Sequence, residues 1–290
     1  VSMSNAVKII ECPRDAMQGI KDFIPTEKKV QYLQALLRCG FDTIDFGSFV
    51  SPKAIPQMVD TAEVLSKLDL STTKSKLLAI VANTRGAQDA SNHPEIQYLG
   101  YPFSISENFQ MRNTHKTIQQ SVETLQEILN IADASNKEVV TYISMGFGNP
   151  YGDPWNVEIV GEWTEKLSAM GAKILSLSDT VGTSDPETID YLFSNLIPKY
   201  PDIEFGAHLH TTPTTWHEKI HAAYQAGCVR FDGAIQGFGG CPMAKDDLTG
   251  NMPTEKVLSY MTQVKAETNV KMMSFESSYN EATKIFTKYH

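Results

Sequence analysis

Short apolar runs alternate along the chain with longer segments in which apolar residues recur at helical spacing. Most of the short runs are continuous rather than alternating, which is typical of strands that are buried on both faces of a sheet. This order predicts repeated βα units around a parallel sheet. The eight predicted strands are Val7–Cys12, Thr43–Phe46, Lys76–Ala82, Ile96–Phe103, Glu138–Met145, Ala172–Asp179, Glu204–His210 and Val229–Gln236.

The segments between these strands carry the marks of amphipathic helices. In Thr26–Cys39 one apolar stripe recurs at helical spacing; we expect Thr26 to be the N-cap and Gly40 to be the left-handed residue after the helix. Further predicted helical segments are Ile118–Ile131, Val157–Met170, Thr188–Leu196, Thr254–Val264 and Phe275–Phe286.

The number of βα units favours one architecture. Eight units in about 250 residues fit a closed (β/α)8 TIM barrel better than an open doubly wound sheet. No GxGxxG follows the first strand, and no Pro/Gly/Ser linker divides the chain. We therefore expect residues 1–290 to form one catalytic barrel domain, with additional terminal helices after about residue 251.

Composition excludes several classes of protein. The chain has 290 residues, of which 41% are apolar and 20% charged, and this is ordinary for a globular protein. A net charge of -9, with no basic run longer than a pair, argues against binding of nucleic acid. No apolar run approaches the roughly 18 residues that span a bilayer, so we expect no membrane association. The four cysteines form no CxxC, which indicates a reducing, cytoplasmic setting.

Polar residues end the predicted strands, where the active site of such a barrel is formed. The candidate catalytic residues are Arg14, Asp15, Asp45 and Cys241, the last of these in a glycine-rich loop after the eighth strand. The candidate substrate contacts are Gln18, Asn83, Ser144 and Asp179.

His208 and His210 point to a metal site, because residues two apart on a strand lie on the same face. Asp15 and the amide oxygen of Asn251 complete a set of two nitrogens and two oxygens. Such a set suits six-coordinate Mg²⁺ or Mn²⁺ better than a closed zinc site. The alternative is that the two histidines only form hydrogen bonds with their neighbours.

Arg14 and Cys241 each allow two interpretations. Arg14 is either a structural ion-pair partner or a group that stabilises a developing oxyanion, because its guanidinium keeps its charge. The glycines around Cys241 predict a mobile lid that delivers an adjustable acid or base. Cys12, Cys39 and Cys228 are predicted to be small buried apolar residues.

Together these residues resemble the hydroxymethylglutaryl-CoA lyases, within the metal-dependent lyase and synthase barrels. The resemblance covers nearly the whole chain. Its most specific parts are the Ser48–Lys53 block and the Gly-Gly-Cys-Pro of the cysteine loop. The matching stretches are Pro13–Gln18, Ser48–Lys53, Pro56–Met58, Asn83–Gly86, Ser178–Gly182, His208–His210, Gly237–Pro242 and Gly250–Asn251.

The resemblance implies a divalent cation at Asp15, His208, His210 and Asn251, with Arg14 steadying a thioester enolate. It implies retro-Claisen cleavage of 3-hydroxy-3-methylglutaryl-CoA, or a close acyl-CoA, to acetoacetate and acetyl-CoA. A base would remove the hydroxyl proton before the C–C bond breaks, and Cys241 would supply acid–base chemistry. The family also implies a homo-oligomer, with a dimer expected.

Several positions depart from the family pattern, and they surround the expected acyl group. The start is Cys12-Pro13-Arg14-Asp15-Ala16 in place of Gly-Pro-Arg-Asp-Gly. The other departures are Ile10, Asp45, Asn149, Thr211-Thr212 and Asp246-Asp247.

Two other hypotheses remain open at this point. One is a Claisen-type acyl-CoA/2-oxoacid synthase or a 4-hydroxy-2-oxoacid aldolase on the same barrel. The other is a non-catalytic barrel that binds a metal or an acyl-CoA, which the retention of Arg14 and Cys241 disfavours.

Overall fold

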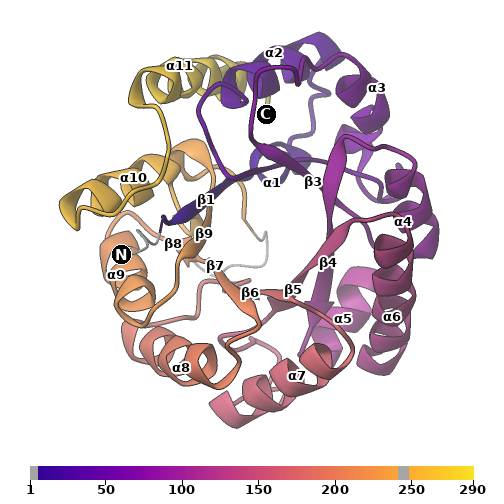
Figure 1. Ribbon diagram of the computed structural model, residues 1–290, viewed down its shortest axis with the longest axis vertical. Helices are drawn as coiled ribbons and strands as arrows, with labels where there is room; N and C mark the ends of the chain where they lie inside the picture. Colours follow the sequence, from indigo (N-terminus) through magenta and orange to yellow (C-terminus); the bar gives the residue numbers. More distant parts are fainter. Residues whose placement is uncertain (1–5, 241–247) are drawn as a thin grey trace.

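The computed structural model describes residues 6–240 and 248–290, in which eight parallel strands close into a barrel inside a ring of helices (Figure 1). The strands follow one another around the barrel in chain order, and β9 returns to pair with β1. The predicted TIM-barrel class is therefore confirmed. The barrel strands are β1 (Lys8–Glu11), β2 (Thr43–Ser48), β3 (Lys76–Ile80), β4 (Ile96–Ser104), β5 (Glu138–Ser144), β6 (Ile174–Ser178), β7 (Glu204–His208) and β9 (Arg230–Gly233).

The helices of the ring present apolar stripes to the barrel, and several begin at strong caps. Thr117 and Gln120 form a capping box, and Asn156 and Asp185 each accept a hydrogen bond from a first-turn amide. The helices are α1 (Pro13–Gln18), α2 (Thr26–Leu36), α3 (Thr61–Ser66), α4 (Thr84–Ser91), α5 (Glu107–Thr114), α6 (Ile118–Ala134), α7 (Val157–Ala169), α8 (Pro186–Lys199), α9 (Trp216–Gln225), α10 (Thr254–Gln263) and α11 (Met272–Lys288), with short 3₁₀ turns at Pro56–Met58 and Ile235–Gly237.

The start of α2 corrects one prediction. Thr26 is the first helical residue, and Pro25 occupies the N-cap position. The Thr26 hydroxyl donates instead to Asp60 Oδ2 at 2.7 Å, so a tertiary partner outcompetes the local cap. Gly40 has a φ of 89°, as expected of a left-handed residue after the helix, although the helix itself ends three residues before the predicted Cys39.

The terminal helices cover the outside of the barrel, as the sequence predicted. Helix α11 lies beside α2 (Figure 1), and the edge of Phe286 meets Tyr32 with ring centroids 6.3 Å apart. Phe275, near the start of α11, meets Phe41 in the same way at 6.4 Å. The carboxyl-terminal segment is thus packed against the first βα unit.

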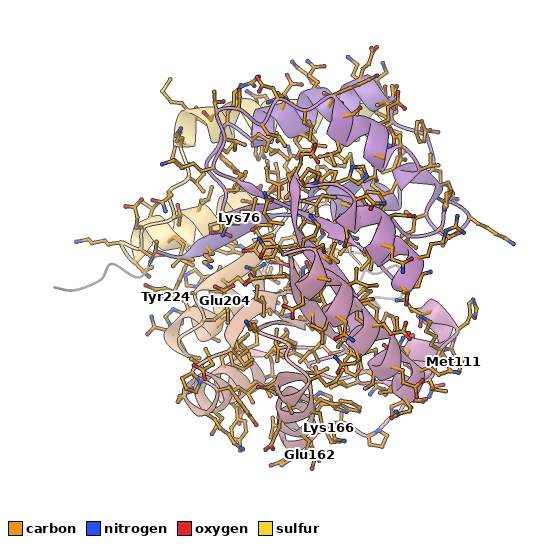
Figure 2. All side chains as sticks on the ribbon, turned by 45° about the vertical axis from the view of Figure 1, so that its right-hand side comes forward. Lys76, Met111, Glu162, Lys166, Glu204 and Tyr224 are labelled. Carbon is orange, nitrogen blue, oxygen red and sulfur yellow. The ribbon has the colours of Figure 1, made fainter. Side chains whose placement is uncertain are left out.

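The amino end of the barrel is tied by ion pairs rather than by catalytic groups. Glu204, at the start of β7, accepts from Lys8 at 2.5 Å and from Arg230 at 3.1 Å. Figure 2 labels Glu204 together with Lys76, which begins β3 and donates to the Tyr98 hydroxyl at 3.4 Å. The ion pair between Lys8 and Glu204 joins β1 to β7, which are distant in the sequence.

The barrel interior has two unlike halves. An apolar group on β3 to β6 comprises Leu78, Ile80, Tyr98, Val140, Tyr142 and Ile174, separate from the larger core between barrel and helices. The other half carries charged and polar side chains from β2, β7 and β9. The two halves meet where Tyr142 faces His208, with ring centroids 6.0 Å apart.

The predicted seventh strand, Glu204–His210, is interrupted. Strand β7 ends at His208, and His210 begins β8 (His210–Thr211), which pairs antiparallel with β10 (Gly250–Asn251). In this register Asn251 lies opposite His210. Two predicted metal ligands, 41 positions apart, are therefore brought together by a small sheet at the carboxyl end of the barrel.

Candidate active site

A cavity of about 280 Å³ opens at the carboxyl ends of the barrel strands. Its wall combines a charged side, from α1 and β7, with an apolar side that includes Ile80 and Phe109. Sequence reasoning missed Phe109 and Asn113, which come from α5 rather than from a strand end. The lining residues are Arg14, Asp15, Gln18, Ile80, Phe109, Asn113, Tyr142, Ser144, Ser178, Thr180, His208, His210 and Gly240.

Three of the predicted metal ligands converge at this cavity. One ligand atom each from Asp15, His208 and His210 lies within 4.8 Å of the other two. His208 Nε2 is 3.3 Å from Asp15 Oδ2. His210 Nδ1 is 2.9 Å from the Thr180 carbonyl, so Nδ1 carries the proton and the lone pair of Nε2 stays available.

Two orphaned buried atoms test whether these residues fit a cation. Within the described residues, His210 Nε2 and Asn251 Oδ1 are buried without a hydrogen-bond partner. Asn251 Nδ2 donates to the Phe238 carbonyl at 2.8 Å, which fixes the amide with its oxygen free. A buried nitrogen and a buried oxygen that both lack donors fit a bound divalent cation, and the donor set suits Mg²⁺ or Mn²⁺.

The electrostatics of the site favour a positive charge between the carboxylates. Burial opposes charge on both partners, yet the hydrogen bond between Asp15 and His208 holds the pKa of Asp15 well below its usual range. Hydrogen bonds from His208 to Asp15 and Asp232 overcome burial and raise the pKa of His208 to about 10. The pKa of His210 is lowered, first by burial and then by the charge of His208.

Asp232 on β9 is a site residue that sequence reasoning missed. Its Oδ2 lies 2.8 Å from His208 Nδ1, while its Oδ1 is buried without a partner in the described part of the chain. A carboxylate on the far nitrogen of a ligating histidine fixes the tautomer and the ring orientation. The only signal in the sequence was an acidic residue inside the predicted run Val229–Gln236.

Arg14 is both an ion-pair partner and part of the cavity wall. Its Nη2 donates to Asp45 Oδ2 at 2.7 Å, its Nε to Asp45 Oδ1 at 3.1 Å and its Nη1 to Gln18 Oε1 at 2.8 Å. Burial and this carboxylate act in opposite directions, and the net pKa of Arg14 is raised, so the guanidinium stays charged. Asp45 therefore orients Arg14, and the two interpretations of Arg14 are compatible.

The four predicted substrate contacts divide into two pairs. Gln18 and Ser144 line the cavity, whereas Asn83 and Asp179 do not. Asn83 Oδ1 caps α4 by accepting from the Gly86 amide at 2.8 Å. Asp179 accepts from the Ser184 amide at 2.9 Å and from Lys219 at 3.0 Å, and also from the Ser184 hydroxyl. The structure thus gives Asn83 and Asp179 local roles in holding the loops beneath the cavity.

Cys241 and the Asp246-Asp247 pair lie outside the described residues. The chain reaches position 240 beside the site, because Gly240 lines the cavity. Gly239 has a φ of 88°, and a Cβ there would lie 2.7 Å from the Asp15 carbonyl and 2.8 Å from Asn251 Nδ2. Glycine is required at 239 because the backbone passes directly over two predicted metal ligands.

A larger groove of about 500 Å³ adjoins the cavity and shares Asp15, Gln18 and Gly240 with it. It runs between the segment after α1 and the end of α11. Its floor includes Phe238 and Phe286, which stack with ring centroids 4.2 Å apart. The site can therefore accept a compact polar group joined to a long, partly apolar arm.

Cys12 lies beside His208 and Asp232, with one ligand atom from each of the three residues within 4.8 Å of the other two. It follows β1, its amide donates to the Gly233 carbonyl of β9 at 2.9 Å, and its side chain is buried as predicted. Burial, followed by the negative charges of Asp232 and Asp45, raises the pKa of the Cys12 thiol well above its usual range.

Comparison with known proteins gives a consistent result. The HMGL-like family model matches residues 6–280. A hydroxymethylglutaryl-CoA lyase of Bacillus subtilis is 32% identical over 260 residues, which cover 90% of this chain and 86% of the relative.

In the described residues, no helix is long and apolar enough to cross a membrane.

Solved structures agree with this match. An HMG-CoA lyase structure from Bacillus subtilis superposes with a TM-score of 0.90 at 31% identity, covering 97% of this chain and 93% of the other. An HMG-CoA lyase from A. baumannii, in complex with coenzyme A and 3-methylmalate, superposes with a TM-score of 0.87 at 26% identity, covering 96% and 90%.

Proposed function

The chain belongs to the HMGL-like family, and from this membership and the site geometry we propose that it is a hydroxymethylglutaryl-CoA lyase. The reaction is retro-Claisen cleavage of 3-hydroxy-3-methylglutaryl-CoA, or a close acyl-CoA, to acetoacetate and acetyl-CoA. The observation that carries the proposal is the convergence of Asp15, His208 and His210 beside the Arg14 guanidinium. That arrangement combines cation ligands with a permanent positive charge where an anion develops.

We assign Asp15, His208, His210 and Asn251 as the residues that hold the divalent cation. When bound, Mg²⁺ or Mn²⁺ lowers the pKa of a coordinated hydroxyl and gathers the substrate oxygens. The orphaned Nε2 of His210 and Oδ1 of Asn251 support this assignment. Asp232 holds the imidazole of His208 with Nδ1 protonated, so that the lone pair of Nε2 would be free to ligate the cation.

Arg14 acts on the charge that appears as the C–C bond breaks. The hydroxyl proton leaves to a base, the electron pair of the C–C bond passes to the thioester as an enolate, and the enolate carbon then takes a proton. Within the described residues, Asp45 and Gln18 use three of the five N–H donors of Arg14. The remaining donors can meet the enolate oxygen, an interaction that strengthens only in the transition state.

Gln18 and Ser144 stay the proposed substrate contacts. Both line the cavity, and Gln18 also holds Arg14 Nη1. The adjoining groove is suited to the long arm of an acyl-CoA, because it begins at Asp15 and Gly240 and has an aromatic floor. We further propose that Cys241, one residue beyond the cavity-lining Gly240, gives the proton to the enolate carbon.

A panel assay of the full chain tests the proposal. With Mg²⁺ or Mn²⁺ we expect acetoacetate to be released from hydroxymethylglutaryl-CoA, and we expect chelation of the metal to abolish the release. Condensation of acetyl-CoA with 2-oxoacids would identify a synthase, and cleavage of 4-hydroxy-2-oxoacids an aldolase. If none of these substrates is turned over, the remaining hypothesis is a non-catalytic barrel that binds a metal or an acyl-CoA.

His208→Ala separates the site from the fold in this assay. We expect the variant to stay folded and to lose both Mn²⁺ binding, measured by calorimetry, and acetoacetate release. His217→Ala is the matched control, because His217 is an exposed histidine on α9 away from the cavity. Undiminished Mn²⁺ affinity in His208→Ala would remove His208 from the metal site.

We place the enzyme in the cytoplasm and expect a homodimer. Cys12, Cys39 and Cys228 are free thiols, which suits a reducing compartment. Sedimentation at several concentrations measures the oligomeric state, and a monomer throughout would overturn the expectation of a dimer.

A further inference from the structure

His208 also belongs to a second group of potential ligands. One ligand atom each from Cys12, His208 and Asp232 lies within 4.8 Å of the other two. Cys12 and Asp232 are buried, with 1% and 3% of their surface exposed. The three residues come from neighbouring barrel strands, at the end of β1, the end of β7 and within β9. This second group is called the lower set below, and Asp15, His208, His210 and Asn251 the upper set.

We propose that the lower set is a second metal site, selective for thiophilic divalent ions such as Zn²⁺ or Cd²⁺, whose occupation takes His208 away from the upper set. Two independent observations support the site. The thiol of Cys12 is a soft ligand, and the buried Oδ1 of Asp232 has no hydrogen-bond partner within the described residues. Thiolate, imidazole and carboxylate are the ligands from which zinc sites are built.

The ligand chemistry makes the two sites exclude one another. A neutral imidazole has one lone pair and one N–H, so it binds a metal through one nitrogen only. The hydrogen bond from Nδ1 to Asp232, at 2.8 Å, leaves the lone pair on Nε2 for the upper set. If Nδ1 binds a metal, the proton that remains on the ring lies on Nε2, where Asp15 Oδ2 is 3.3 Å away as its acceptor. Binding displaces the proton of the Cys12 thiol and, from the doubly protonated ring of His208, the proton on Nδ1.

Charge around the lower set favours a cation. Three acidic side chains, those of Asp232, Asp45 and Asp15, act electrostatically on Cys12. Arg14 is directed away, toward Asp45, and Arg230 toward Glu204. A hard cation such as Mg²⁺ gains little from a thiolate and prefers the oxygen-rich upper set.

Cd²⁺ is the probe, because a cadmium–thiolate bond absorbs in the ultraviolet where Mg²⁺ complexes do not. The metal-free full chain is titrated with Cd²⁺, with and without excess Mg²⁺. We expect thiolate absorption that Cys12→Ala removes, together with at least about a 10-fold loss of Cd²⁺ affinity. Cys228→Ala is the matched control, because Cys228 is an equally buried thiol outside the lower set. Cys12→Ser keeps the side-chain volume if the alanine variant does not fold.

The proposal also predicts inhibition, and in this respect alone it rests on the proposed lyase function. Cd²⁺ or Zn²⁺ should inhibit Mg²⁺-dependent cleavage, and Cys12→Ala should be at least about 10-fold less sensitive while its basal rate stays within about twofold. Equal absorption and affinity in the wild type and Cys12→Ala would overturn the lower site. So would absorption that disappears only in Cys241→Ala. Because the absorption titration needs no turnover, absent cleavage with Cys12-dependent absorption would count against the lyase function alone.

Discussion

The two halves of the barrel interior share one scaffold and differ in almost every physical property. The half on β3 to β6 is lined by Leu78, Val140 and other apolar groups, whereas the half on β2, β7 and β9 holds Asp45, His208 and Asp232. The apolar wall contributes stability through burial. Its low polarity beside the charged half also strengthens the field of each buried charge.

The comparison shows that the side chains that position the metal ligands and the side chains that stabilise the barrel by apolar burial come from different strands. Tyr142 marks the boundary, because it belongs to the apolar group and its ring meets His208 edge to face. Changes in the apolar half should therefore appear in the free energy of unfolding, and changes in the charged half in metal binding and rate. Three substitutions test this separation, from the largest expected effect to the smallest, and a fourth probes a buried acid outside the barrel interior.

Leu78→Ala, in the apolar half, should cost the most. Leu78 is fully buried, and one of its methyl groups packs closely over Gly100, so truncation leaves a cavity. We expect the free energy of unfolding to fall by about 2–5 kcal/mol, with unchanged Mn²⁺ affinity. Chemical denaturation and calorimetry measure the two quantities. A comparable loss of Mn²⁺ affinity would show that the two halves are not separable.

Arg14→Lys, in the charged half, should leave the fold intact and slow cleavage by at least about 10²-fold, which corresponds to about 2.7 kcal/mol. A lysine cannot hold both Asp45 oxygens and still direct donors into the cavity. Steady-state kinetics with saturating Mn²⁺ measure the loss. Asp45→Asn should show a loss in the same direction, because it releases Arg14; near-normal turnover in Arg14→Lys would make the arginine purely structural.

Asp232→Asn should weaken Mn²⁺ binding by about 10- to 100-fold, because His208 loses the carboxylate that fixes its tautomer. Calorimetry gives the affinity, and nitrogen NMR of the histidine ring shows which nitrogen carries the proton. Glu204→Gln is the matched control, since Glu204 pairs with Arg230 at the opposite end of the barrel. Unaltered affinity together with an unaltered tautomer would mean that Asp232 does not orient His208.

Glu11→Gln should change the pH dependence of stability rather than the activity. Glu11 lies on the outer face of β1, where Thr254 and the Ile235 amide donate to it, and burial raises the pKa of Glu11 from 4.5 to about 8. An acid whose pKa rises on folding binds more protons in the folded state, so the unfolding free energy falls as the pH rises from about 4.5 to about 8.

The glutamine variant should lose that component, so its stability relative to the wild type should increase across this interval. Denaturation of both proteins at about pH 5 and about pH 8 measures the difference, expected to be about 3 kcal/mol for a pKa raised from 4.5 to about 8. A pH dependence identical to that of the wild type would contradict the assignment to Glu11.

Much of the candidate site could be predicted because its residues belong to short sequence motifs. Arg14 and Asp15 follow a predicted strand, and His208 and His210 stand two residues apart. Asn83 and Asp179 also follow strands, but their side chains are satisfied locally, by the Gly86 amide and by Ser184 with Lys219. Position at a strand end shows that a residue is near the site, and only its hydrogen bonds show whether it faces the cavity.

The sequence by itself determined the barrel, its order of strands and helices, and the family, because hydrophobic periodicity and short motifs are local properties of the chain. The tertiary structure decided what depends on closure and register. It placed Asn251 opposite His210 through β8 and β10, brought Asp232 to His208, and set Cys12 beside both. Such neighbours come from strands far apart in the chain. The spacing of residues within one strand does not predict which side chains of the other strands they will contact across the barrel.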